Sequence, residues 1–166
     1  IAPEQRGDLV SKLKAAARTK FRQPQTKSSQ GEEETGKSGK TLILLGASTG
    51  GTEAIREILS HLPTSLPPIC IVQHIPSDFS GLFAERLNSY CAISVKEAAD
   101  GDQLRPGWAF VAPGDKHMIL ARDFSGKFSL KIRDGEKIMH HRPSIDLMFE
   151  STAAVAGPQV VAGLLT

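Results

Sequence analysis

Two short and uninterrupted apolar segments restrict the possible folds of this chain most strongly. Residues 41–46 (TLILLG) and 69–75 (ICIVQHI) have the length of a β-strand and consist mostly of large apolar side chains. Strands with this pattern are covered on both faces, as they are in parallel sheets. Apolar residues at helical spacing follow each segment, over residues 50–62 and 78–90. Strands that alternate with helices in this way predict an α/β fold.

The remaining sequence extends this alternation. Further elements are predicted as strands at 92–98, 108–112 and 159–165, a helix at 143–156, and an antiparallel hairpin from 118–121 and 128–132. The predicted fold class is therefore α/β, with a doubly wound, mostly parallel sheet, helices on both faces and an appended antiparallel hairpin.

The first 40 residues differ from the rest in composition. Residues 8–21 have the pattern of an amphipathic helix, so 1–21 is expected to connect to another domain, whereas 22–40 lack large apolar side chains and predict a flexible linker. These 40 residues carry nine Lys or Arg and five Asp or Glu, which leaves residues 41–166 with a net charge of −2. We therefore expect a folded domain over 41–166, and not a nucleic-acid-binding one, since those concentrate basic residues on the folded face.

The sequence predicts a cytoplasmic protein. Its start lacks the pattern of a secretory signal, and no apolar run reaches the roughly 18 residues that a membrane-spanning helix needs. Cys70 and Cys91 form neither a disulfide framework nor a CxxC pair, as expected for a reducing compartment.

The loop after the first predicted strand carries the candidate chemistry, because ligands of open α/β sheets bind at the carboxyl ends of the strands. Gly46-x-Ser48-x-x-Gly51 resembles a dinucleotide-binding fingerprint, but serine replaces the middle glycine and obstructs a pyrophosphate. Residues 31–38 match the Walker A pattern, yet no strand precedes them, so we attribute this match to linker composition. A non-catalytic phosphate- or nucleotide-binding module, or a regulatory one, stays open as an alternative.

Gly46-x-Ser48-x-Gly50 also has the spacing of a nucleophile elbow, in which small residues permit a sharp turn before a helix. A serine hydroxyl needs a base to become a nucleophile. His74 is the candidate base, since it ends the neighbouring predicted strand and adjacent strands lie about 4.8 Å apart. The simpler interpretation makes Ser48 a small turn residue and His74 a hydrogen-bonded edge residue, and spacing alone does not separate the two.

Other polar residues have structural interpretations. We expect a structural hydrogen bond at His117, and capping or a helix-dipole interaction at Asp146. His140 and His141 would point to opposite sides of an extended chain, and no spaced Cys or carboxylate cluster completes a metal site with them. The sequence therefore predicts no metal and no organic cofactor.

Four segments in order, TLILLGASTGG, IVQHIPSDFSGLFAERLN, FVAPGDKHM and HRPSIDLMF, resemble the catalytic domain of the chemotaxis protein-glutamate methylesterase family, CheB. The resemblance covers residues 41–166. It implies a carboxylic ester hydrolase of the serine type that removes methyl esters from glutamates of chemoreceptors and, in many members, also deamidates glutamines.

The resemblance also implies roles, partners and a boundary. Ser48 would be the nucleophile, His74 the general base, and Thr49 and Gly50 supports of the site and its oxyanion. The implied partners are methyl-accepting receptors as substrate, an upstream receiver domain of a response regulator and its histidine kinase, with no nucleic acid and no membrane insertion. The family's aspartate lies in a Gly-Met-Gly-x-Asp-Gly segment that would follow Thr166. We therefore expect residues 1–166 alone to be nearly inactive, by about 10⁴-fold.

Overall fold

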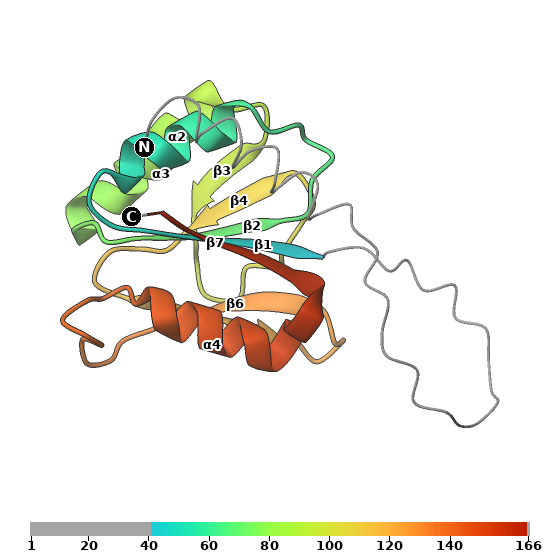
Figure 1. The fold of residues 1–166 in the computed structure, drawn as a ribbon. Helices are drawn as coiled ribbons and strands as arrows, with labels where there is room; N and C mark the ends of the chain where they lie inside the picture. Colours follow the sequence, from blue (N-terminus) through green and yellow to red (C-terminus); the bar gives the residue numbers. More distant parts are fainter. Residues whose placement is uncertain (1–40, 166) are drawn as a thin grey trace.

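The structure, a computed structural model, describes residues 41–165, so the predicted helix at 8–21 and linker at 22–40 lie outside the described residues (Figure 1). The elements in chain order are β1 (Leu42–Ala47), α2 (Gly51–Ser60), β2 (Ile69–Gln73), α3 (Ser77–Tyr90), β3 (Ser94–Glu97), β4 (Trp108–Val111), β5 (His117–Arg122), β6 (Phe128–Arg133), α4 (Ile145–Ala156), a short 3-10 helix (Gly157–Gln159) and β7 (Val160–Leu165). In this part of the chain, a parallel sheet has the strand order β3-β4-β2-β1-β7, and β5 and β6 form a separate antiparallel hairpin.

Helices cover both faces of the sheet. In Figure 1, α2 and α3 lie on one side, and α4 lies on the other side together with the hairpin. Ile43 and Leu45 of β1 pack into the apolar cluster under α2 and α3, whereas Leu42 and Leu44 pack into the cluster towards α4. All four side chains are at most 2% exposed. The continuous apolar run is therefore buried on both faces, and the predicted fold class is confirmed.

Element ends differ from the prediction where a proline or a cap interrupts the pattern. β2 ends at Gln73 and Pro76 directly precedes α3, so His74 lies in a loop and not in the strand. α4 begins two residues later than predicted, because the Ser144 hydroxyl caps it by accepting a hydrogen bond of 3.2 Å from the Leu147 amide. Ser144 thus supplies the cap that we expected from Asp146, which lies in the first turn instead.

The register between β1 and β2 fixes the position of the candidate site. Ala47 pairs with Gln73 as the last residue of each strand, and the His74 amide donates a hydrogen bond of 3.2 Å to the Ala47 carbonyl. Ser48 and His74 therefore leave the sheet side by side at its carboxyl edge.

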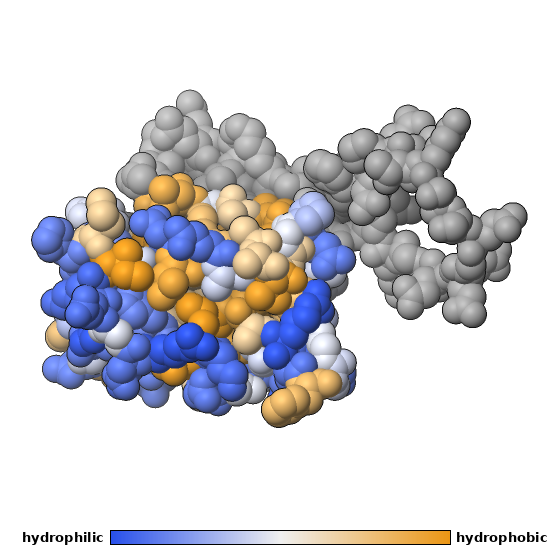
Figure 2. All heavy atoms as spheres, turned by 90° about the horizontal axis from the view of Figure 1, so that it is seen from below, coloured by the Kyte–Doolittle hydropathy of each residue, from blue (hydrophilic) through white to orange (hydrophobic). Residues whose placement is uncertain are grey.

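The face that carries α4 is rich in apolar side chains. Figure 2 shows them gathered in the middle of this face, with hydrophilic side chains mainly on its left and along its lower edge. The α4 sequence, IDLMFESTAAVA, is mostly apolar, yet its buried residues are only Met148, Thr152 and Ala156. Within residues 41–165, every helix is too short or too polar to span a bilayer.

Candidate active site

Ser48 lies in the tight turn between β1 and α2. The turn closes through a hydrogen bond of 2.8 Å from the Gly51 amide to the Ser48 carbonyl. Gly50, the N-cap of α2, has the positive φ of 74° that this reversal requires. The half-buried Ser48 side chain thus sits just before a helix N-terminus, where free N–H groups favour negative charge.

His74 faces Ser48 across this turn. Its Nδ1 atom lies 3.2 Å from the Ser48 hydroxyl oxygen, within hydrogen-bond distance. The two side chains that the sequence predicted to meet are therefore in contact. A serine hydroxyl hydrogen-bonded to an imidazole has the geometry for proton transfer from oxygen to nitrogen. Whether the pair is catalytic stays a prediction.

Gln73 connects the backbones of these two residues. Its buried Nε2 atom donates hydrogen bonds to the carbonyl of Ser48 at 2.9 Å and to the carbonyl of His74 at 3.3 Å. Its Oε1 atom has no hydrogen-bond partner among residues 41–165 and lies against Gly51, where a Cβ atom would approach it to 2.1 Å. We did not predict this role, although a buried amide at the end of an apolar strand, directly before a candidate base, was a visible signal.

A second imidazole covers the His74 ring. The rings of His74 and His141 are stacked, with their centroids 3.8 Å apart and an interplanar angle of 4°. Burial lowers the pKa of His74 below its ordinary value of 6.5, the nearby His141 lowers it further, and the Asp146 carboxylate opposes both. The net shift keeps His74 neutral near pH 7, in the form that accepts a proton.

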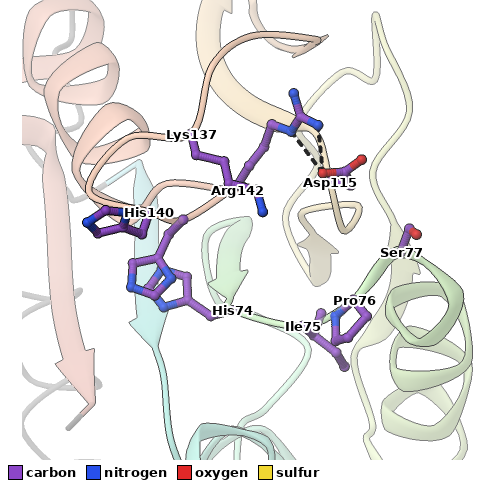
Figure 3. A pocket seen from close by; sticks show the side chains of 9 residues that line it. His74, Ile75, Pro76, Ser77, Asp115, Lys137, His140 and Arg142 are labelled. Atoms are coloured by element: carbon purple, nitrogen blue, oxygen red, sulfur yellow. Dashed lines mark hydrogen bonds and ion pairs between the residues drawn. The ribbon is translucent and has the colours of Figure 1, made fainter.

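A pocket of about 380 Å³ opens beside His74. Figure 3 shows its walls: the segment after β2 on one side, and the loop before α4 on the other. Its lining residues are His74, Ile75, Pro76, Ser77, Asp115, Lys137, His140, His141 and Arg142. The pocket is large enough for part of a polypeptide side chain and its neighbours, and it ends at the candidate base.

Cationic side chains dominate the polar lining of this pocket. Arg142 donates hydrogen bonds to Asp115 at 3.0 and 2.7 Å, and this contact lowers the pKa of that carboxyl. Lys137, whose charge lowers the pKa of Asp115 further, makes no hydrogen bond or ion pair in the described part of the chain. Among the described residues, the pocket therefore offers the positive charge of Lys137 without a hydrogen bond or ion pair to it.

His117 lies behind the loop that lines the pocket. It is 3% exposed, and its Nε2 atom contacts the Glu136 carbonyl at 2.8 Å. Its Nδ1 atom accepts a hydrogen bond of 3.3 Å from the Ser144 amide. The expected structural role of His117 is confirmed, since both ring nitrogens hold backbone groups of this loop in place.

The other predicted site residues, Thr49 and Gly50, make no side-chain hydrogen bond to His74 among the described residues. Thr49 is exposed. Gly50 shapes the turn and leaves open space at its Cα atom. No group of His, Cys, Asp and Glu suited to a metal ion occurs within residues 41–165.

Comparisons with known proteins agree with the resemblance seen in the sequence. The family model described as CheB methylesterase matches residues 43–166. A protein-glutamate methylesterase/protein-glutamine glutaminase from Salmonella typhimurium is 54% identical over 129 residues, and one from Enterobacter cloacae is 53% identical. Each alignment covers 78% of this chain and 37% of the relative, so the chain spans little more than a third of these relatives' length.

A solved structure has the same fold. The catalytic domain of a CheB methylesterase from Thermotoga maritima matches 77% of this chain and 68% of its own, with a TM-score of 0.73 and 34% sequence identity.

Proposed function

Because the chain belongs to the CheB methylesterase family, we propose that it is the catalytic part of a protein-glutamate methylesterase of the serine hydrolase type. The observation that carries this proposal is the 3.2 Å contact between the Ser48 hydroxyl and His74 Nδ1, at the carboxyl edge of the sheet. A nucleotide-binding loop would not need a base at that position.

The proposed reaction follows from this contact. The Ser48 oxygen attacks the carbonyl carbon of a glutamyl methyl ester while its proton passes to His74 Nδ1. Backbone N–H groups at the start of α2 stabilise the oxyanion. The C–O bond to methanol then breaks, and the leaving oxygen takes the proton from His74. Water, deprotonated by the same imidazole, then attacks the acyl carbon. The bond from that carbon to the Ser48 oxygen breaks, the Ser48 oxygen takes the proton back from His74, and the glutamate is released.

The relatives' name includes glutaminase activity, and the same steps accommodate it. With a glutamine side chain as substrate, ammonia replaces methanol as the leaving group and needs the same proton from His74. We include this deamidation in the proposal.

The proposed substrate is a segment of a chemoreceptor, and the proposal extends to the longer protein. Residues 41–166 would be the catalytic domain, and 1–21 and 22–40 would connect it to a receiver domain that a histidine kinase phosphorylates. Lys137, which lines the pocket and makes no hydrogen bond or ion pair within residues 41–165, supports a substrate segment that carries carboxylates beside the neutral methyl ester.

A fluorophosphonate probe, which reacts with activated serines, tests the proposal together with methanol release from a methylated receptor peptide. Both are measured on this chain and on a version continued through the family's aspartate segment. We expect Ser48→Ala to abolish labelling and hydrolysis, and Ser65→Ala, at an exposed loop serine, to leave both unchanged. Labelling that survives Ser48→Ala, or tight nucleotide binding without labelling, would contradict the proposal.

A further inference from the structure

The contact between His74 and His141 has no role in the reaction as described so far. A stack at 3.8 Å with nearly parallel planes covers one face of the His74 ring and leaves its edge free. That edge carries Nδ1, which faces Ser48 at 3.2 Å. Rotation about the last side-chain torsion of histidine is a soft motion, because this torsion has broad minima. A flat neighbour on the ring face restricts it.

The loop that carries His141 is built around a tight turn; we call residues 134–144 the strap. Ile138 and His141 exchange two backbone hydrogen bonds of 3.0 and 2.9 Å. Between them, Met139 and His140 both have positive φ, 49° and 68°. A two-residue turn with this backbone favours Asn-Gly, and other side chains there are strained. The strap thus adopts an unfavourable conformation at the point that presents His141 to His74.

The strap is anchored on both sides of this turn. His117 holds the Glu136 carbonyl on one side and the Ser144 amide on the other. Arg142, next to His141, is hydrogen-bonded to Asp115 from the segment after β4. His141 is exposed, so its own burial does not keep it in place, and the strap's anchors fix its position instead.

From these contacts we propose that His141 is a positioning residue, whose imidazole holds the ring of His74 with Nδ1 directed at Ser48. The inference deepens the proposed function, on which it rests, by naming a residue that acts through the base and does not touch the reacting atoms.

The charges around His74 limit how the stack can work. The ionisable groups of the pocket beside this ring are His140, His141, Lys137 and Arg142 from the strap and Asp115 from the segment after β4. Of the described groups, His141 and Asp146 of α4 are the two whose charges shift the pKa of His74. A positive charge on His141 would repel the imidazolium that forms on His74, whereas Asp146 stabilises it. Because His141 lowers the pKa of His74, the effect of the stack on His74 is visible in a titration of the His74 ring.

Nuclear magnetic resonance of histidine rings tests the inference on this chain without any need for turnover. His141→Phe keeps a flat ring without a charge, and His141→Ala removes the ring. We expect the titration midpoint of His74 to rise in His141→Phe, and to rise further in His141→Ala, where burial is also lost. Contacts between the His74 ring and Ser48 protons should persist in His141→Phe and average out in His141→Ala.

The matched control is His140→Asn, which removes the adjacent imidazole and suits the positive φ of that position. It should leave the His74 midpoint and ring contacts close to those of the unmodified chain. An unchanged His74 midpoint and unchanged ring contacts in both His141 variants would overturn the inference.

The reaction of Ser48 with a fluorophosphonate, measured on the version continued through the family's aspartate segment, gives a second readout. His141→Ala should slow this reaction about tenfold or more, because a misplaced catalytic group costs one to two orders of magnitude, and His141→Phe should restore it. An equal decrease of the Ser48 reaction rate in His141→Ala and His141→Phe would reject a positioning role. If the resonance data show the ordered ring while Ser48 never reacts in any variant, the proposed hydrolase function fails and the stack itself stands.

Discussion

Gln73 shows how one side chain can align two others through their backbones. Its amide donates to the carbonyls of Ser48 and His74, so the turn after β1 and the loop after β2 cannot separate without breaking both bonds. Neither carbonyl belongs to the reacting atoms. Gln73 is therefore expected to affect the reactivity of the pair and the stability of the fold together.

We predict that Gln73→Leu lowers the free energy of unfolding by about 1–3 kcal/mol, the usual cost of leaving buried polar groups unpaired. Labelling of Ser48 should slow as well. Urea denaturation and the fluorophosphonate rate measure the two effects. Gln103→Leu, which removes a surface contact of 3.2 Å to Asp123, is the control and should change both by little. A wild-type labelling rate in Gln73→Leu would rule out the alignment.

The lowered pKa of His74 predicts how the labelling rate of Ser48 depends on pH. Burial and the neighbouring His141 lower the pKa of His74, so the neutral base persists to a lower pH than an ordinary histidine allows. The labelling rate of Ser48 should therefore fall on the acid side with a midpoint below 6.5. His74→Gln should remove this limb together with the activity, and a midpoint at or above 6.5 would contradict the assignment.

The same shift affects folding. Since the pKa of His74 is lower in the folded state than in the unfolded state, the unfolded state binds more protons between the two values. The stability that the neutral ring provides is complete above 6.5 and decreases as the pH falls towards the folded pKa. In acid denaturation, His74→Gln should lose less stability across this window than the unmodified chain does.

At the scale of elements, the turn between β1 and α2 depends on two glycines for different reasons. Gly50 needs its positive φ of 74°, and nothing lies within 4 Å of a Cβ atom added there. Gly51 has an ordinary backbone, but an added Cβ would lie 2.1 Å from Gln73 Oε1 and 2.5 Å from the Ala47 Cβ. The first glycine permits the turn, and the second lets α2 begin close to the strands.

These two causes predict an order of stabilities. Gly50→Ala should destabilise by about 1–2 kcal/mol, the cost of a left-handed residue with a Cβ, and Gly50→Asn by less. Gly51→Ala should cost at least as much as Gly50→Ala, since overpacking typically costs about 1–3 kcal/mol, and should also displace Gln73. Urea denaturation of the three variants checks the order. A Gly51→Ala variant as stable as the unmodified chain would show that α2 is free to shift.

At the scale of the whole molecule, the pocket combines segments that are distant in sequence. The segment after β2, the segment after β4 and the strap meet only because β2 and β4 are neighbours in the sheet and the strap precedes α4 on the opposite face. Residues 41–166 carry a net charge of −2, yet the pocket holds Lys137, a cation without an ion pair in the described part of the chain. Local charge, and not net charge, therefore determines which substrate suits this face.

We predict that Lys137→Glu raises the KM for an acidic, methyl-esterified peptide about fivefold, the effect of roughly 1 kcal/mol of exposed charge interaction, with little change in kcat. The effect should weaken at high salt. Lys127→Glu, in the turn of the hairpin, changes the net charge equally but lies outside the pocket lining. Equal effects of the two variants would show that the pocket does not contact the substrate through Lys137.

The sequence by itself determined the α/β fold and the meeting of Ser48 with His74. Two apolar runs of strand length, each followed by a helical pattern, imply parallel strands, and parallel strands bring their carboxyl ends to one edge. These are consequences of local periodicity and of a regular hydrogen-bonding geometry, so they can be read without coordinates. The structure adds the register, in which Ala47 pairs with Gln73 at the ends of β1 and β2.

Only the tertiary structure decided what surrounds that pair. His140 and His141 were expected to point to opposite sides of an extended segment. Instead, Met139 and His140 form a turn in which both have positive φ. Neither residue is the glycine or asparagine that would have indicated such a turn in the sequence. The stack on His74 and the pocket beside it depend on how the strap packs across the sheet. Such contacts join residues far apart in the chain, and the periodicity of a single segment contains no information about them.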